Sequence, residues 1–301
     1  MDIASIPQVI ESCGFCRADD VENLQVMKAG MTNRSFSFCV NDSKYIIRIP
    51  GEGTDQLINR SQEHDVYRVI SPLDISDRVH YFDSASGIKI SSYLSNAHAC
   101  DSANKADVKD CMTALRRFHE HRLHVDHTFD LWERINFYES LWLGVDSCYA
   151  DYFDVKQSVL SLRRYIDSQS IESVLCHIDA VSDNFLFVPD TGEIKLIDWE
   201  YAGMQDPHLD IAMFAVYALY DRSQVDYLID QYFPEGCSPI IRMKIYCYIA
   251  ICGLLWSNWC EFKRNCGVEF GVYAYRQYDY AKEYSTVFRQ EYYKVFGIAY
   301  V

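Results

Sequence analysis

Fold and chemistry are predicted most directly by the stretch His177-Ile-Asp-Ala-Val-Ser-Asp-Asn184 and by the later Leu196-Ile-Asp-Trp-Glu200. Two short apolar runs lie between its polar groups and are separated by the turn-forming Pro189-Asp-Thr-Gly192. This pattern predicts a small hairpin carried by an otherwise helical region. The hairpin would bring together three oxygen-bearing side chains that are far apart in the sequence: Asp179, Asn184 and Asp198.

The spacing of these three residues suits phosphoryl transfer. A His-x-Asp-x-x-x-x-Asn segment followed by a later Asp is the arrangement of kinase catalytic loops. The reaction needs one group that orients or deprotonates the attacking hydroxyl, and Asp179 suits this task. It also needs oxygen ligands that hold Mg²⁺ against the phosphates, and Asn184 and Asp198 suit this second task. Each residue alone is an ordinary turn or loop residue, but the combination favours catalysis.

The predicted elements give an α+β fold in two lobes. A small antiparallel sheet with one helix, for which Thr54 is the N-cap candidate, precedes a larger and mainly helical region. We expect a nucleotide-binding lobe at residues 1–94 and a catalytic and acceptor-binding lobe at residues 95–301. The predicted strands are 24–28, 35–40, 45–49, 79–83 and 88–93, and the predicted helices are 54–70, 107–118, 132–143, 155–168 and 240–263.

The third predicted strand carries a cation for the nucleotide phosphates. Arg48 lies inside the apolar run Tyr45-Ile-Ile-Arg-Ile-Pro50, where burial of a charge requires a partner. Glu63 on the following helix is the expected partner, and an exposed arginine on an edge strand is the alternative. The turn before the second strand would cover the phosphates, which adds three candidates: Gly30, Thr32 and Asn33. One glycine in a hairpin is by itself only a turn signal.

Composition disfavours several other classes of function. The net charge of -15 disfavours nucleic acid as a partner but permits ATP when Mg²⁺ supplies positive charge. The 12 cysteines follow no framework, and the lone Cys13-x-x-Cys16 lacks a second ligand pair, so we expect reduced thiols. The apolar run 245–259 is too short to span a bilayer and predicts a buried helix. The start of the chain lacks the features of a secretory signal, so we expect a cytoplasmic protein without a membrane partner.

These motifs resemble those of the choline kinase family, in particular the bacterial LicA type, and more distantly the eukaryotic choline and ethanolamine kinases. The resemblance covers about residues 24–285 and is carried by Gly30-Met-Thr-Asn33, Arg48, Gly53-Thr-Asp-Gln-Leu-Ile-Asn-Arg60, His177-Ile-Asp179, Asn184 and Ile197-Asp-Trp-Glu-Tyr201. It implies a bilobal protein-kinase-like fold shared with aminoglycoside phosphotransferases, ATP as cosubstrate and Mg²⁺ as cofactor. It also implies that adenine binds at the hinge near Ser91 to Leu94, with Ser92 and Tyr93 as the candidate contacts. The chain has no GxGxxG motif, which argues against a protein kinase.

The resemblance also implies an aromatic site for the cation of the acceptor. Trp256 and Trp259 are three residues apart on a predicted helix and therefore share one face. With Tyr273 they would surround a trimethylammonium group, which donates no hydrogen bond and is best held by ring faces. Further candidates are Glu200, Tyr201 and Tyr275. Without the resemblance, the two tryptophans are more simply explained as core residues.

The sequence therefore predicts a choline kinase that converts ATP and choline into ADP and phosphocholine. Two alternatives stay open. An ethanolamine kinase or an aminoglycoside-type phosphotransferase would use the same fold, but it would need acids and hydrogen-bond acceptors where this chain has indoles. A catalytically inactive nucleotide-binding module is the other alternative, and the intact Asp179, Asn184 and Asp198 argue against it.

Overall fold

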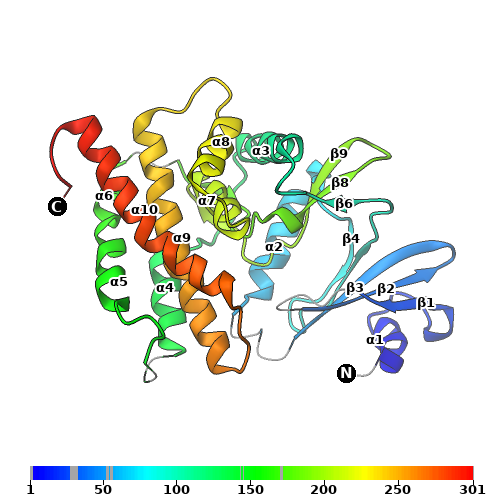
Figure 1. Ribbon diagram of the computed structural model, residues 1–301. Helices are drawn as coiled ribbons and strands as arrows, with labels where there is room; N and C mark the ends of the chain where they lie inside the picture. The colour runs from blue at the N-terminus through cyan, green and yellow to red at the C-terminus, as the bar shows by residue number, and fades with distance from the viewer. Residues whose placement is uncertain are drawn as a thin grey trace. The chain divides into compact units, whose positions relative to one another are not determined.

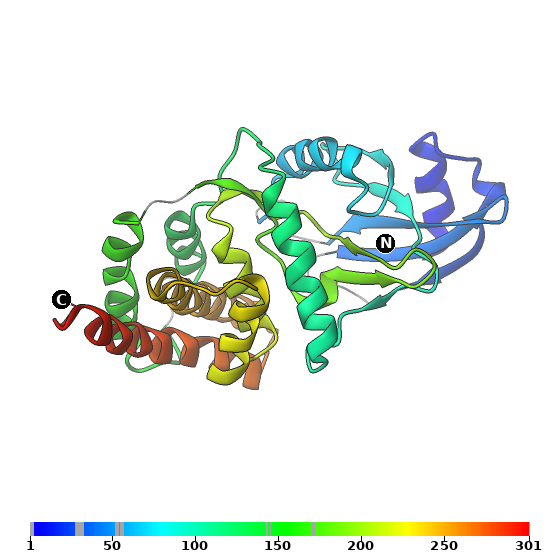
Figure 2. The ribbon, with the colours of Figure 1, turned by 90° about the horizontal axis from the view of Figure 1, so that it is seen from above.

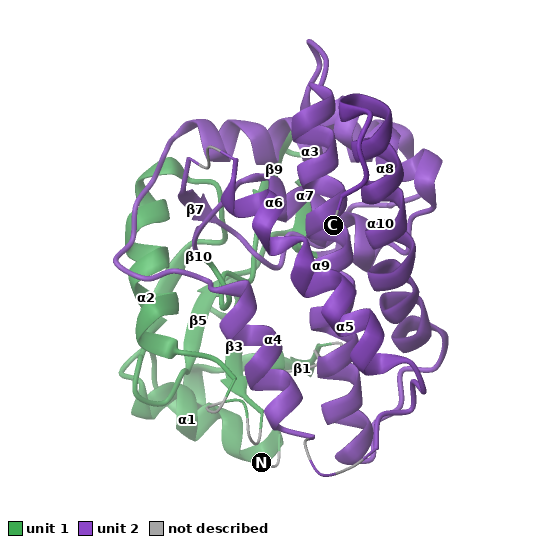
Figure 3. Ribbon diagram, turned by 90° about the vertical axis from the view of Figure 1, so that its left-hand side faces the viewer, with its two compact units in different colours: residues 1–99, 184–202 green, residues 100–183, 203–301 purple. Residues whose placement is uncertain are grey.

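The computed structural model describes residues 3–27, 33–51, 54, 57–142, 144, 146–169 and 172–300 and divides the chain into two compact units (Figure 3). The first unit contains residues 1–99 and 184–202, and the second contains residues 100–183 and 203–301. We expected a single boundary near residue 94. The chain instead leaves the first unit after Ala99 and returns to it for the segment that follows Asp183.

The first unit is built on a five-stranded antiparallel sheet (Figure 1). Its elements are α1 (Ile6–Ser12), β1 (Glu22–Val26), β2 (Asn33–Val40), β3 (Ser43–Pro50), α2 (Arg60–Ile70), β4 (Val79–Phe82) and β5 (Lys89–Ser92). The strand order is β1-β2-β3-β5-β4. Alternating apolar residues such as Phe36 and Phe38 on β2 and Ile47 and Ile49 on β3 form a core with α1. Apolar and polar residues alternate along each strand, so the apolar side chains lie on the face of the sheet that α1 covers.

The predicted hairpin is present in the first unit. It consists of β8 (Phe185–Val188) and β9 (Glu193–Leu196), which pair antiparallel, with β6 (His98–Ala99) on the far side of β8. The N–H of Gly192 donates to the carbonyl of Val188 at 2.8 Å. Gly192 has φ +70°, a conformation that glycine adopts without a steric penalty. The turn chemistry read from the sequence therefore closes this hairpin.

The helix predicted at residues 54–70 begins later than expected. Asn59 is the N-cap of α2, and its side chain accepts the N–H groups of Ser61 and Gln62 at 3.1 and 3.3 Å. The hydroxyl of Thr54 donates to the carbonyl of Gly51 at 2.8 Å instead. The prediction of Thr54 as the N-cap is therefore wrong.

The second unit is mainly helical. Its helices are α3 (Lys105–Glu120), α4 (Leu131–Ser140), α5 (Tyr152–Ser161), α6 (Arg163–Asp167), α7 (His208–Tyr217), α8 (Arg222–Tyr232), α9 (Pro239–Asn265) and α10 (Val272–Phe296). A two-stranded sheet pairs β7 (Val174–Cys176) with β10 (Gly203–Gln205). The helix predicted at residues 155–168 is thus two helices, with a break at Leu162.

Helix α9 is the central helix of the second unit and packs along α10 (Figures 1 and 2). Gly253 permits this close approach, because a Cβ atom there would lie 2.5 Å from the carbonyl oxygen of Gln277. Among the described helices, α9 has the length and apolar character to cross a membrane, but 78% of its most apolar window is buried within the protein. This burial agrees with the predicted core helix.

Candidate active site

The segment that carries Asp179 follows β7 and is held through its backbone. Asp210 on α7 accepts the N–H of His177 on Oδ2 and the N–H of Ile178 on Oδ1, each at 2.8 Å. Ile178 has φ +68°, a left-handed conformation that a β-branched residue adopts only when its surroundings impose it. The two hydrogen bonds to Asp210 therefore fix the backbone immediately before Asp179.

A buried histidine holds Asp210 in turn. The Nε2 atom of His119 lies 3.0 Å from Asp210 Oδ2, and its Nδ1 atom lies 2.8 Å from the hydroxyl of Tyr232. Cys176 lies close to these groups, and a trio of His, Cys and Asp is a donor set that metals use. Both oxygens of Asp210 already accept backbone N–H groups. We therefore interpret the trio as a support for the loop.

The hairpin places Asn184 and Asp198 at adjacent strand ends in the first unit. Asn184 immediately precedes β8, and its carbonyl accepts the N–H of Ile197 at 3.0 Å. Asp198 follows with φ +67°. The next residue, Trp199, is fully buried, and its indole N–H donates to the carbonyl of Leu196 at 2.8 Å. The buried Trp199 thus fixes the backbone at Asp198, next to the strand that begins after Asn184.

Arg48 on β3 is buried and paired with Glu63 on α2. The Nη2 atom of Arg48 donates to Glu63 Oε2 at 2.9 Å, and Nη1 donates to the other carboxylate oxygen. Burial acts to lower the pKa of Arg48, but the charge and hydrogen bonds of Glu63, together with the charges of Glu200 and Asp198, outweigh burial and hold this pKa above its ordinary value. Nη1 of Arg48 also lies 3.8 Å from Asp198 Oδ1. The predicted pairing is present, and it places a permanent cation next to Asp198.

A second arginine extends this network: Arg60, which is part of the family motif in the sequence but was given no role there. Nη1 of Arg60 donates to Glu63 Oε2 at 2.7 Å and to Glu200 Oε2 at 3.0 Å. Nη2 of Arg60 donates to Asn33 Oδ1 at 3.0 Å, and Nδ2 of Asn33 donates to Glu200 Oε2 at 2.8 Å. The first unit therefore joins these predicted site residues in one cluster: Asn33, Arg48, Glu63, Asp198 and Glu200.

The other predicted nucleotide contacts are Ser92 and Tyr93 at the end of β5, and Gly30 and Thr32, which precede β2 in the sequence. The N–H of Ser92 donates to the carbonyl of Arg78 at 2.9 Å, and the N–H of Tyr93 donates to the carbonyl of Lys44 at 3.0 Å. These two N–H groups are therefore engaged within the first unit, so contacts of Ser92 and Tyr93 with a base would use their carbonyl or side-chain groups. Gly30 and Thr32 lie outside the described residues.

The aromatic residues predicted to bind the cation of the acceptor form one cluster in the second unit. The ring centres of Trp256 and Trp259 are 6.1 Å apart, those of Trp259 and Phe270 are 5.0 Å apart, and those of Phe270 and Tyr273 are 6.3 Å apart. Trp259 is only 3% exposed, whereas Trp256 and Tyr273 are partly exposed. Burial raises the pKa of Tyr273 well above its ordinary value, and neighbouring groups that include Asp179 raise it further. The charge of Asp179 is thus one of those that act on this cluster.

Tyr217 on α7 belongs to the same cluster, although the sequence did not predict it as a site residue. Its ring centre lies 6.4 Å from that of Tyr273, and its hydroxyl donates to Asp183 at 3.0 Å. Burial raises the pKa of Tyr217, and the charges of Asp183 and Asp179 raise it further. Tyr217 ends an apolar helix, so its sequence context indicates core; only the packing of α7 brings it to this site.

The two remaining aromatic candidates are placed differently. Tyr201 is partly buried and follows Glu200 in the first unit. Tyr275 is 60% exposed, and its ring centre lies 6.0 Å from that of Tyr149. Tyr275 therefore belongs to another aromatic pair.

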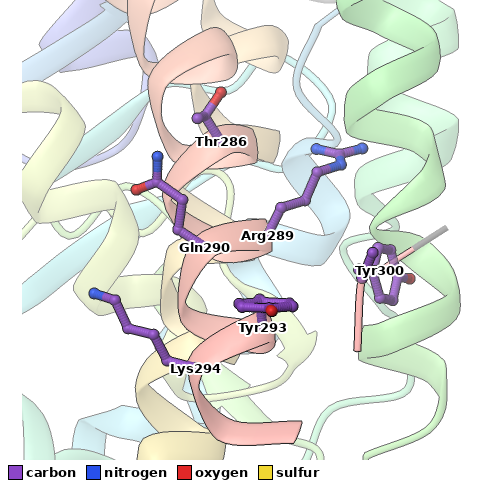
Figure 4. A pocket seen from close by; sticks show the side chains of 7 residues that line it. Thr286, Arg289, Gln290, Tyr293, Lys294 and Tyr300 are labelled. Atoms are coloured by element: carbon purple, nitrogen blue, oxygen red, sulfur yellow. The ribbon is translucent and has the colours of Figure 1, made fainter. Parts of the chain in front are cut away.

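A cavity of about 520 Å³ lies elsewhere on the second unit (Figure 4). Arg289 and Tyr293 on α10 and Tyr300 after it line this cavity. The guanidinium of Arg289 donates to the carbonyls of Ser285 and Ser158 at 2.8 and 3.3 Å. Its lining contains none of the predicted site residues, so this cavity is not the candidate active site.

Comparison with known proteins decides the family. The family model for choline/ethanolamine kinases matches residues 24–232. The chain belongs to this family. Among curated relatives, protein LicA of Haemophilus influenzae is 28% identical over 267 residues, which cover 84% of this chain and 77% of the relative. The crystal structure of choline kinase LicA from Streptococcus pneumoniae aligns with a TM-score of 0.80 at 28% identity and covers 94% of this chain and 98% of that one.

Membership of the choline/ethanolamine kinase family confirms the predicted class of enzyme. The chain is an ATP-dependent kinase with an alcohol as acceptor. The predicted α+β kinase-like fold is confirmed as well. Aminoglycoside phosphotransferase APH(4)-Ia, at 16% identity, shares the fold with a TM-score of 0.62 over 95% of this chain and 98% of that one.

Proposed function

We propose that this protein is a choline kinase, which transfers the γ-phosphoryl group of ATP to the hydroxyl of choline and yields phosphocholine and ADP. The match to the choline/ethanolamine kinase family carries the proposal. Two features of the structure support it. Asp179 lies on a loop whose backbone is hydrogen-bonded to Asp210, and Asn184 and Asp198 lie at adjacent strand ends. We place the reaction in the cytoplasm, since all 12 cysteines are free thiols and α9 is a buried helix.

Each site residue has a defined task in this reaction. Asp179 accepts a hydrogen bond from the choline hydroxyl, and so orients its oxygen toward the γ-phosphorus. Asn184 and Asp198 would hold Mg²⁺, because amide and carboxylate oxygens are the donors that this cation prefers. When bound, Mg²⁺ supplies positive charge against the phosphate oxygens. Arg48, held by Glu63, binds the phosphates together with Asn33 and the preceding residues Gly30 and Thr32. Ser92 and Tyr93 supply the contacts to the base.

The test of the proposed function is release of ADP across a panel of acceptors. Choline, dimethylethanolamine, ethanolamine and an aminoglycoside would each be supplied with Mg·ATP at several concentrations, and kcat/KM compared. We expect choline to give the highest value. A preference for ethanolamine would support an ethanolamine kinase of the same family. Phosphorylation of the aminoglycoside alone would refute both the choline kinase and the ethanolamine kinase hypotheses.

The phosphate-gripping role of Arg48 gives a first prediction. We expect Arg48→Ala to raise the KM for ATP about ten- to hundredfold, because charge-assisted hydrogen bonds are worth roughly 1.5–3 kcal/mol. The KM for choline should change little. Arg68→Ala is the matched control, since Arg68 is an exposed arginine on α2. An unchanged KM for ATP in Arg48→Ala would contradict this role.

The aromatic cluster gives a second prediction, which concerns the choice of amine. Trimethylammonium is weakly hydrated and fits ring faces, whereas the primary ammonium of ethanolamine must lose a strong hydration shell. We expect Trp256→Ala to lower kcat/KM for choline roughly tenfold, with a smaller effect on ethanolamine and none on the KM for ATP. Because Trp259 is nearly buried, Trp259→Ala should lower the thermal stability as well.

The control for the aromatic cluster is Trp132→Ala. Trp132 is a partly exposed tryptophan on α4 that contacts Arg163. Its removal should leave both kinetic constants unchanged. Equal losses for choline and ethanolamine in Trp256→Ala would mean that this indole is core and that the acceptor is bound elsewhere.

A further inference from the structure

Four charged side chains of the first unit form a buried, balanced network around Glu63. Arg48, Arg60, Glu63 and Glu200 are 5%, 8%, 1% and 7% exposed, so two positive and two negative charges are removed from water together. Glu63 Oε2 accepts from Arg48 at 2.9 Å and from Arg60 at 2.7 Å. Arg60 therefore restrains the carboxylate that orients Arg48.

The same arginine reaches the residue that begins β2. Arg60 donates to Asn33 Oδ1 at 3.0 Å and to Glu200 Oε2 at 3.0 Å, and Asn33 donates to the same oxygen of Glu200 at 2.8 Å. Gly87 lies close to Arg60, because a Cβ atom at Gly87 would lie 2.9 Å from Arg60 Nε. Gly87 has φ +71°, and its carbonyl accepts a hydrogen bond from Arg48 at 3.3 Å. The turn at Gly87 therefore lies next to both arginines.

These contacts leave Glu200 poorly suited to attract a substrate cation. One of its oxygens is bound by Arg60 and Asn33, and Nη1 of Arg48 lies 3.9 Å away. Its side chain is 2% exposed. The field of a carboxylate between two guanidinium groups is largely cancelled at longer range.

We propose that Arg60 and Glu200 are positioning residues for the nucleotide phosphates, which hold Arg48 and Asn33 in place, and that Glu200 does not bind the cation of the acceptor. The inference rests on the proposed function only in that the bound nucleotide is Mg·ATP. It reassigns Glu200, which the family resemblance placed at the acceptor site, and it adds Arg60 to the residues on which phosphate binding depends.

The test compares binding of Mg·ADP, measured by isothermal titration calorimetry, with the KM for choline. The variants are Arg60→Lys, Arg60→Gln, Glu200→Gln and the double variant Arg60→Gln/Glu200→Gln, which leaves Arg48 and Glu63 as a neutral pair. Lysine keeps the charge but carries it on one nitrogen and lacks the planar fork with which Arg60 reaches Glu63 and Glu200 from Nη1 and Asn33 from Nη2, so lysine would rescue a requirement for charge alone. Arg68→Gln on α2 and Glu193→Gln on β9, both exposed, are the matched controls.

We expect Arg60→Lys and Glu200→Gln each to weaken Mg·ADP binding about tenfold, with the KM for choline within about twofold of the wild type. The double variant should lose less than the product of the losses of Glu200→Gln and Arg60→Gln alone, because it leaves no uncompensated buried charge. The two controls should bind Mg·ADP as the wild type does.

Three outcomes would overturn the inference. The first is a raised KM for choline in Glu200→Gln with unchanged Mg·ADP binding, and the second is unchanged Mg·ADP binding in Arg60→Lys and in the double variant. The third is loss of the folded state in both of these variants, which would make the network purely structural. A wild type that binds Mg·ADP but phosphorylates no choline would refute the proposed function alone, because Mg·ADP binding requires no acceptor.

Discussion

Replacement of Asp179 by asparagine is expected to lower kcat by about 10²–10⁴-fold while ATP binding stays nearly intact. The carboxylate acts on the acceptor hydroxyl as it attacks, and the amide keeps the shape of the side chain but is a far weaker base. The backbone around residue 179 should be unaffected, because its supports are the N–H groups of His177 and Ile178 and the carboxylate of Asp210. Steady-state kinetics with Mg·ATP and choline measure the effect.

The matched control for Asp179→Asn is Asp154→Asn, an exposed acid on α5 of the same unit. It should leave kcat and both KM values unchanged. Binding of Mg·ADP should be the same in wild type, variant and control, which separates loss of catalysis from loss of nucleotide binding. Full turnover by Asp179→Asn would remove Asp179 from the reaction.

The hairpin could be predicted from sequence because its determinants are local. Pro189 to Gly192 is a turn-forming stretch between two apolar runs, and antiparallel pairing then places the ends of both strands next to each other. The sequence therefore predicted that Asn184 and Asp198 lie side by side. The pairing of Arg48 with Glu63 was predictable for a similar reason, since a charge within an apolar strand requires a partner on a neighbouring element.

The role of Arg60 could not be predicted in this way. Its partner Glu200 is 140 residues away in the sequence, and an arginine in the first turn of a helix has no periodicity that indicates burial. The start of α2 was misplaced because Thr54 and Asn59 are both residues that cap helices, and only the contacts of their side chains distinguish them. Tyr217 was missed because the packing of α7, which no local pattern encodes, brings it to Tyr273.

Replacement of Asp198 by alanine is expected to abolish Mg²⁺-dependent activity, with a loss on the order of 10³-fold or more. A bound cation contributes several kcal/mol of charge stabilisation in the transition state, and each 1.36 kcal/mol is a factor of ten in rate. Removal of the carboxylate should leave the fold intact, because the backbone of this segment is anchored by the buried Trp199 and Arg48 keeps its pairing with Glu63.

The decisive measurement for Asp198→Ala is ADP binding with and without Mg²⁺. Wild type should bind ADP more tightly when Mg²⁺ is present, and the variant should lose this difference while it retains metal-independent binding through Arg48. Asp190→Ala is the matched control, since Asp190 is an exposed acid in the turn of the same hairpin. If Asp198→Ala kept the full Mg²⁺ dependence of both ADP binding and turnover, the metal would have to be held by other oxygens, and Asp198 would not be a ligand of the metal.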